Sequence, residues 1–227
     1  MIKSLLIILS ILHMSTALAV NKAPNTSKAP DTANINKSVV DIIDPPNSAA
    51  LNIMVDALSS LKELKKQNKA TPENIEALIR IKLLPNIAIG VSTKITLSKH
   101  WNNLNIGQKE FFQYYIAESL IQDYISILSS YDKLNTVKIA VDPKVKRKDN
   151  KAIVKLIINI NDDPKPIMVS LKMIRLNSWY IYDLVFSGVS IVKNYSAQFN
   201  SHIKRKGVES LIKKSEKKLK KLKNYKK

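Results

Sequence analysis

The spacing of apolar residues changes once along this chain, and that change most constrains its fold. From about residue 48 to Tyr131 the apolar residues recur every three or four positions, which is typical of amphipathic helices. From Thr136 onward they alternate with polar residues, which is typical of strands with one buried face. A run of helices followed by a run of strands predicts an α+β fold, with helices packed on one face of an antiparallel sheet of about four strands.

Four helices are predicted before the change of period, over residues 48–66, 72–83, 87–101 and 108–131. Thr71 is expected to cap the second helix, and Asn105 with Gln108 forms a variant of the capping box before the fourth. This fourth helix is apolar over a wider arc than a surface helix needs. We therefore expect it either to sit deep in the core or to line an apolar space.

The strands are predicted over residues 136–141, 153–160, 167–173 and 179–186. The last begins with Trp179, is aromatic and β-branched, and is expected to turn at Ser187-Gly188 directly into a helix that contains Val189. Gly207 is expected to end that helix, and a final lysine-rich helix follows.

The first residues have the pattern of an export signal. A basic Lys3 precedes the apolar run from Leu5 to Leu12, and Ala17-Leu18-Ala19 carries the small residues that signal peptidase reads. Residues 1–19 are therefore interpreted as a signal peptide, residues 20–46 as a flexible tether, and residues 47–223 as a single α+β domain with a basic C-terminal helix. An uncleaved anchor is the alternative, although the apolar run is short for a membrane span.

The chain carries a formal net charge of +19, which indicates an anionic partner. Export favours a membrane surface over nucleic acid. The chain contains no cysteine, which excludes disulfides, zinc sites built on thiolates, and lipid attachment through an N-terminal cysteine.

No pattern in the sequence indicates catalysis. Outside the signal the histidines are His100 and His202, which lack metal-ligand spacing, and Asp123 and Asp183 are far apart in the sequence. The histidines are interpreted as structural or surface residues, and Asp183 is expected to cap a helix or pair within the fold. We expect neither an enzyme nor a metal site nor a cofactor.

Several stretches resemble a known family in order and spacing from about residue 50 to 215. They are Leu83-Leu84-Pro85, His100-Trp101, Gln108 with Phe111-Phe112, Trp179 with Tyr182-Asp183, Gly188-Val189-Ser190 with Tyr195 and Phe199, and Lys206-Gly207-Val208 with Leu211-Ile212. Together they resemble the MlaC/Ttg2D family of periplasmic phospholipid-transport (toluene-tolerance) proteins. The resemblance implies a soluble periplasmic shuttle between an outer-membrane lipoprotein–porin complex and an inner-membrane ABC transporter with an MCE-type subunit. Phospholipid would be its cargo, held by the acyl chains in an apolar cavity between sheet and helices, and its membrane contacts would be transient.

The residues expected to line that cavity come from the apolar faces of the predicted strands and helices. In the last strand we place Tyr182, Leu184 and Phe186 inward, because the other parity would bury Asp183. No charge falls on these faces, so the headgroup is expected to stay at the mouth. The full set is Phe112, Ile116, Leu120, Val154, Leu156, Ile158, Val169, Leu171, Met173, Tyr182, Leu184, Phe186, Val189, Val192 and Phe199.

Two other functions remain open from the residues. The same apolar faces can simply pack against each other, which would leave a cationic, envelope-attached interaction protein with a filled core that works through its basic tail. A hydrolase or isomerase on a cone-shaped α+β fold is the third possibility.

Overall fold

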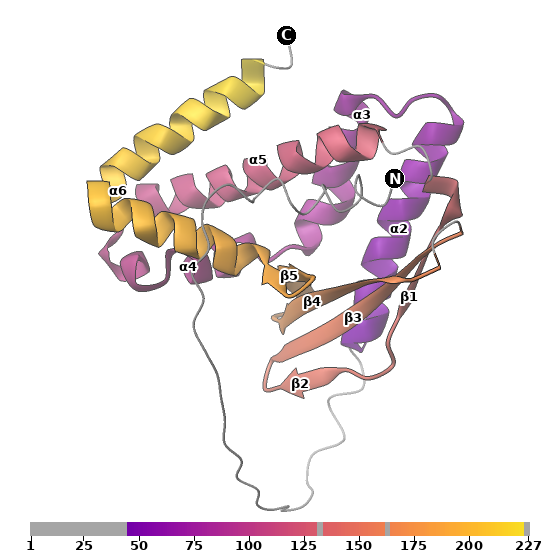
Figure 1. The fold of residues 1–227 in the computed structure, drawn as a ribbon. Helices are drawn as coiled ribbons and strands as arrows, with labels where there is room; N and C mark the ends of the chain where they lie inside the picture. Colours follow the sequence, from indigo (N-terminus) through magenta and orange to yellow (C-terminus); the bar gives the residue numbers. More distant parts are fainter. Residues whose placement is uncertain (1–44, 131–133, 162–163, 225–227) are drawn as a thin grey trace, which may run out of the picture. The chain divides into compact units, whose positions relative to one another are not determined.

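The computed structural model describes residues 45–130, 134–161 and 164–224 (Figure 1). Helices come first and an antiparallel sheet follows, which confirms the α+β prediction. The predicted signal peptide and nearly all of the predicted tether lie outside the described residues. The helical elements are α2 (Pro46–Lys66), α3 (Pro72–Leu78), the π-helical η1 (Ile79–Leu83), the 3-10 turns η2 (Leu84–Asn86), η3 (Ser98–Asn103) and η4 (Leu134–Thr136), α4 (Ile89–Leu97), α5 (Ile106–Ser130) and α6 (Ile191–Asn224).

Two of the predicted helix caps are confirmed by their hydrogen bonds. The Gln108 backbone N–H donates to Asn105 Oδ1 at 2.8 Å, and the Asn105 N–H donates to Gln108 Oε1 at 3.1 Å, so the capping box closes in both directions. The Thr71 hydroxyl accepts from the Asn74 N–H at 3.3 Å. The first helix differs from expectation: neither Asn47 nor Ser48 is its N-cap, because it already begins at Pro46, where proline fits the first helical position. Pro45 precedes it and makes no side-chain cap bond.

The sheet has six strands in place of about four, because two short strands join the four long ones. Its order is β1-β3-β4-β5-β6, and β2 pairs with β3 off this path. The strands are β1 (Val137–Val141), β2 (Lys146–Lys148), β3 (Lys151–Ile160), β4 (Ile167–Arg175), β5 (Trp179–Phe186) and β6 (Val189–Ser190). Every pairing between them is antiparallel.

The sequence predicted that the chain passes from β5 directly into a helix, and this prediction is wrong. Ser187 (φ 47°) and Gly188 (φ 80°) are both left-handed, which gives the two-residue turn of a tight hairpin. Val189 therefore lies in β6 opposite Phe186, and α6 begins only at Ile191. Gly188, which was predicted to precede a helix, is thus the second residue of a hairpin turn.

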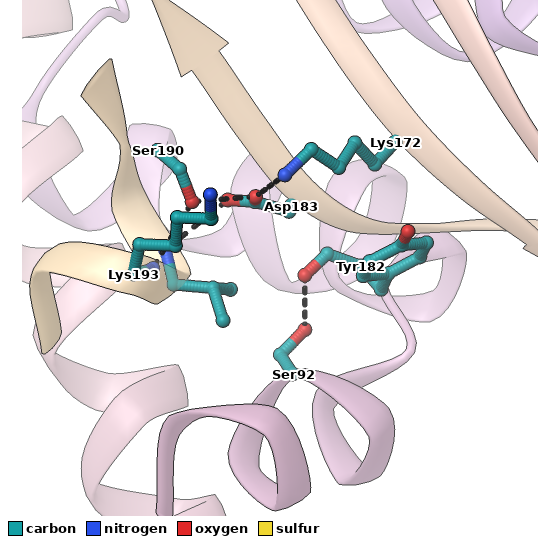
Figure 2. A network of polar contacts seen from close by, with 7 residues as sticks. Ser92, Lys172, Tyr182, Asp183, Ser190 and Lys193 are labelled. Carbon is teal, nitrogen blue, oxygen red and sulfur yellow. Dashed lines mark hydrogen bonds and ion pairs between the residues drawn. The ribbon is translucent and has the colours of Figure 1, made fainter. Parts of the chain in front are cut away.

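A bulge in β5 attaches α4 to the sheet. Asp183 pairs with Lys172 and Ile181 with Met173, so Tyr182 has no partner in β4. The Tyr182 carbonyl accepts instead from the Ser92 hydroxyl at 2.7 Å (Figure 2). Next to it, the Ala88 N–H donates to the Ile181 carbonyl at 2.8 Å. The bulge thus supplies the backbone acceptors that hold the start of α4.

Asp183 holds the start of α6 against the sheet. Its Oδ2 accepts from Ser190 Oγ at 2.6 Å and from Lys172 Nζ at 2.8 Å, and its Oδ1 accepts from the Val192 N–H at 3.1 Å (Figure 2). Ser190 Oγ in turn accepts from the Lys193 N–H at 3.0 Å. The predicted capping and pairing role of Asp183 is confirmed, and Ser190 is the second cap of the same helix.

Gly207 divides α6 in two, as expected. Its backbone (φ 79°, ψ 170°) is not helical, so the helix bends there and its second half folds back along α5 (Figure 1). His202 Nε2, before the bend, lies 3.1 Å from Ser210 Oγ after it.

Replacing Asp183 by Asn should destabilise the fold strongly. Only 2% of the Asp183 side chain is exposed, so the change removes the charge that compensates Lys172 and weakens the α6 cap. We expect the free energy of unfolding to fall by about 3 kcal/mol, and by about 1 kcal/mol for Ser190→Ala. Urea denaturation followed by circular dichroism measures both.

The control for charge alone is Asp149→Asn, at the exposed β2–β3 turn, which should change stability by less than about 0.5 kcal/mol. Equal losses for Asp149→Asn and Asp183→Asn would contradict the anchoring role.

Candidate functional site

One face of the sheet is apolar and is sealed at its centre. Pairing places Val154 opposite Leu171, and Leu156 opposite Val169. Val154, Leu156, Leu171 and Met173 are at most 1% exposed. Helix α2 contacts β1, β3 and β5 and covers this inner face. Five of the predicted lining residues therefore lie together here, since Val169 is buried beside them.

Beside this sealed centre, part of the inner face is only half covered. Ile158 pairs with Ile139 on one side and Ile167 on the other, and all three are half-buried. Leu184 and Phe186, opposite Leu171 and Val169, are half-buried too. We call these five residues the open row. A half-covered apolar surface thus borders the sealed centre, and beyond it Ile160 is buried again opposite Val137.

The open row contains three residues of the predicted set and two from outside it. Ile158, Leu184 and Phe186 were predicted, and they lie on the inner face. The reason given for this parity was wrong, because Asp183 is buried on the opposite face, where Lys172 and Ser190 compensate its charge. Ile139 was missed, although alternation along β1 would have found it. Ile167 lies on the apolar face of the strand predicted over residues 167–173 but was left out of the set.

Tyr182 was predicted to face inward but lies at the bulge and has no partner in β4. Ile181, and not Tyr182, lies opposite the inner-face residue Met173.

The helical residues of the predicted set form a separate cluster. Phe112, Ile116 and Phe199 are buried with Tyr195 between α4, α5 and α6, and Leu120 packs against them. Further along α5, Ile121 and Ile125 belong to a second cluster with α2, α3 and η1. The wide apolar arc of α5 is thus explained by helices on both sides. Of the last two predicted residues, Val192 is buried at the start of α6 and Val189 is 37% exposed on β6.

A polar seam, which sequence reasoning missed, runs between α5 and α6. Ser119 and Tyr195 are buried, yet neither Ser119 Oγ nor Tyr195 Oη has a hydrogen-bond partner of ordinary geometry among the described residues. The two hydroxyls nonetheless act on each other, because hydrogen bonding from Ser119 opposes the rise in the pKa of Tyr195. Ser119 follows Tyr115 by one helical turn and precedes Asp123 by another, and no sequence signal marks these residues as neighbours of Tyr195.

The seam perturbs its ionisable groups chiefly through burial. Burial raises the pKa of Asp123, and nearby Lys218 opposes the shift. Burial and then Asp123 raise the pKa of Tyr124 to about 12. The pKa of Tyr195 is raised by burial and then by Asp123. The tyrosines therefore stay neutral at physiological pH. The seam presents protonated hydroxyl groups and no phenolate that could act as a nucleophile.

A cleft of about 400 Å³ lies between the start of η3 and the first half of α6. Its lining residues are Ser98, Lys99, Lys193, Ser196, Ala197 and Asn200. Five of these six residues are polar or cationic, and none of the residues predicted to hold acyl chains is among them. The cleft is thus distinct from the apolar inner face of the sheet.

Both histidines make structural contacts, as expected. His100 Nε2 lies 3.0 Å from Asn200 Oδ1, and His202 contacts Ser210 across the bend of α6. Burial and then Lys214 lower the pKa of His202. Within residues 45–130, 134–161 and 164–224, no group of three or more His, Cys, Asp or Glu side chains is placed to hold a metal ion. No helix in the same part of the chain is both long and apolar enough to cross a bilayer.

Comparison with known proteins gives consistent results. A family model described as MlaC protein matches residues 52–217. The intermembrane phospholipid transport system binding protein MlaC of Haemophilus influenzae is 23% identical over 158 residues, which are 68% of this chain and 72% of that protein.

A solved structure shares the fold. It is that of the phospholipid-binding protein from Ralstonia solanacearum in complex with a phospholipid, with a TM-score of 0.68 and 20% identity, over 79% of this chain and 99% of the other. The family resemblance seen in the sequence is confirmed: because the family model spans most of the chain, this protein belongs to the MlaC family.

Proposed function

We propose that this protein is a periplasmic carrier that binds a phospholipid by its acyl chains and moves it between the two membranes of the envelope. The observation that carries the proposal is the open row, where an apolar inner face emerges half-covered from a sealed core. The names of the H. influenzae relative and of the R. solanacearum neighbour support phospholipid as the cargo.

Physical chemistry explains why such a carrier needs an apolar interior. Two acyl chains of ordinary length, at about 0.8 kcal/mol per CH₂, would cost on the order of 20 kcal/mol to expose to water. A half-covered apolar face that borders the buried core would shield the chains from water better than an isolated surface patch. The headgroup would stay at the mouth, because no charged side chain belongs to the open row or to the sealed centre beside it. The carrier binds and releases its cargo without catalysis.

The proposed partners follow from the family. They are an outer-membrane lipoprotein–porin complex on one side and an inner-membrane ABC transporter with an MCE-type subunit on the other. The proposed lining is the sheet part of the set derived from the sequence, from Val154 to Phe186, extended by Ile139 and Ile167 of the open row. The helical residues of that set pack against one another between α4, α5 and α6 and stand apart from this lining.

The mature protein, purified without added lipid, should carry phospholipid in stoichiometric amount. Organic extraction followed by mass spectrometry measures this directly. Protein that is free of phospholipid, and that takes up none from vesicles, would favour the rival function of a cationic interaction protein with a filled core.

Two neighbouring isoleucines of β3 provide a matched test of the site. Ile158 and Ile157 are both half-buried, but Ile158 faces the open row and Ile157 faces the other side of the sheet, opposite Met168. A tryptophan at Ile158 would occupy space proposed for an acyl chain. We expect Ile158→Trp to lower the phospholipid content several-fold and Ile157→Trp to leave it unchanged.

Thermal unfolding of the delipidated variants separates the two functions. If lipid space is present, Ile158→Trp fits without much strain. In a filled core the overpacked side chain should cost roughly 1–3 kcal/mol and leave the lipid content equal to that of Ile157→Trp, which would contradict the proposed lining.

Export makes a prediction about the N-terminus. The protein recovered from the periplasmic fraction should begin at Val20, because peptidase is expected to cleave after Ala19. N-terminal sequencing or intact mass spectrometry decides this. Recovery of the chain with residues 1–19 intact in the membrane fraction would favour the uncleaved anchor.

A further inference from the structure

The second half of α6 presents a face made of lysines. After Gly207, the buried side of this helix carries Leu211, Ser215 and Leu219 and packs into the cluster around Phe112. The opposite side is exposed and carries Lys213, Lys214, Lys217, Lys220 and Lys221, which we call the lysine face. The exposed acidic residues on this half of the helix are Glu209 and Glu216.

The fold makes little use of these five charges. Within the described part of the chain, no ion pair joins any of them to a carboxylate. Lys218 behaves differently: it is half-buried, and its Nζ lies 5.9 Å from the centre of the Tyr115 ring. Five like charges held side by side repel one another, so an interaction with something outside the chain is the simplest reason for them.

The residue types favour a lipid surface over a protein partner. Lysine is depleted from the cores of protein–protein interfaces, which use aromatic side chains and arginine. No large exposed apolar side chain lies on this half of the helix among the described residues. Clusters of four to eight basic residues are the pattern that binds anionic lipid headgroups.

We propose that the lysine face of α6 is a docking surface for an anionic phospholipid bilayer. This inference names the membrane contact of the carrier and, for its biological setting, rests on the proposed function. Binding itself needs no cargo. Lys204, Arg205 and Lys206, all exposed next to the bend at Gly207, add to the positive charge at this end of the helix.

Such docking would be shallow and reversible. The helix already buries its apolar side against α5, so none is left to insert into the bilayer. Attraction between exposed charges extends only about 8 Å at physiological ionic strength. The protein would stay near a membrane long enough to meet a partner and would leave without extracting an inserted helix.

The test is co-sedimentation of the mature protein with vesicles. Vesicles of phosphatidylethanolamine and phosphatidylglycerol at three to one should bind it at low salt, and phosphatidylcholine vesicles should not. Each cation at an anionic surface contributes a factor of about five. The combined variant K213Q/K214Q/K217Q/K220Q/K221Q should therefore bind at least about a hundred-fold more weakly.

A control variant with the same loss of charge shows whether binding depends on the lysine face itself or only on the net charge of the protein. K138Q/K144Q/K146Q/K148Q/K151Q removes five exposed lysines from the β1–β3 region and should retain most of the binding. Equal losses in the two variants would overturn the proposal, as would absence of binding to anionic vesicles at low salt. Binding of the lysine face to an acidic protein without binding to vesicles would also overturn it.

Phospholipid content distinguishes this proposal from the proposed function. The helix variant should keep its extracted lipid and its thermal midpoint, because all five side chains are exposed. If the wild-type protein carries no lipid but still binds anionic vesicles through this face, the carrier function fails and the docking surface stands.

Discussion

The carboxylate of Asp183 joins the sheet to the helix on which much of the rest depends. It accepts hydrogen bonds from β4, β6 and the first turn of α6, through Lys172, Ser190 and Val192. A buried charge is costly unless it is paired and hydrogen-bonded, and here the three donors and the positive end of a helix provide that compensation. These hydrogen bonds set the direction in which α6 leaves the sheet. In that direction Tyr195 and Phe199 of α6 pack onto α5, and after the bend at Gly207 the lysine face points outward.

The helices largely stabilise one another, and this leaves part of the sheet free for another role. Helix α5 lies between two apolar clusters, with α4 and α6 on one side and α2 and α3 on the other. On the sheet, α2 covers the inner face at its centre, and the open row from Ile139 to Phe186 is left half-covered. A carrier requires this balance, because an interior filled by its own side chains has no room for cargo and one without support collapses. The proposed carrier function therefore depends on where the cover of α2 ends.

Local patterns predicted the fold class, two helix caps and the role of Asp183, because each of these follows from residues close together in the sequence. The capping box at Asn105 and the bend at Gly207 are such cases. The short strand at Val189 was missed because a glycine before apolar residues fits a helix start as well as a hairpin turn. The shift of alternation at Tyr182 was missed because a bulge depends on the partner strand and on Ser92, ninety residues earlier in the chain. The wide arc of α5 was ambiguous for the same reason: apolar spacing does not tell which neighbour covers a face.

The most direct test of the central claim is to locate the acyl chains on the protein. The mature protein would be loaded with a phospholipid that carries a photoreactive group in one acyl chain, irradiated, digested and sequenced by mass spectrometry. We predict crosslinks to inner-face residues of the sheet, with Ile158, Leu184 and Phe186 among them, and few to Ile157 or Lys155 on the opposite face. Crosslinks confined to that opposite face, or spread evenly over both, would contradict the claim that the chains lie between sheet and helices.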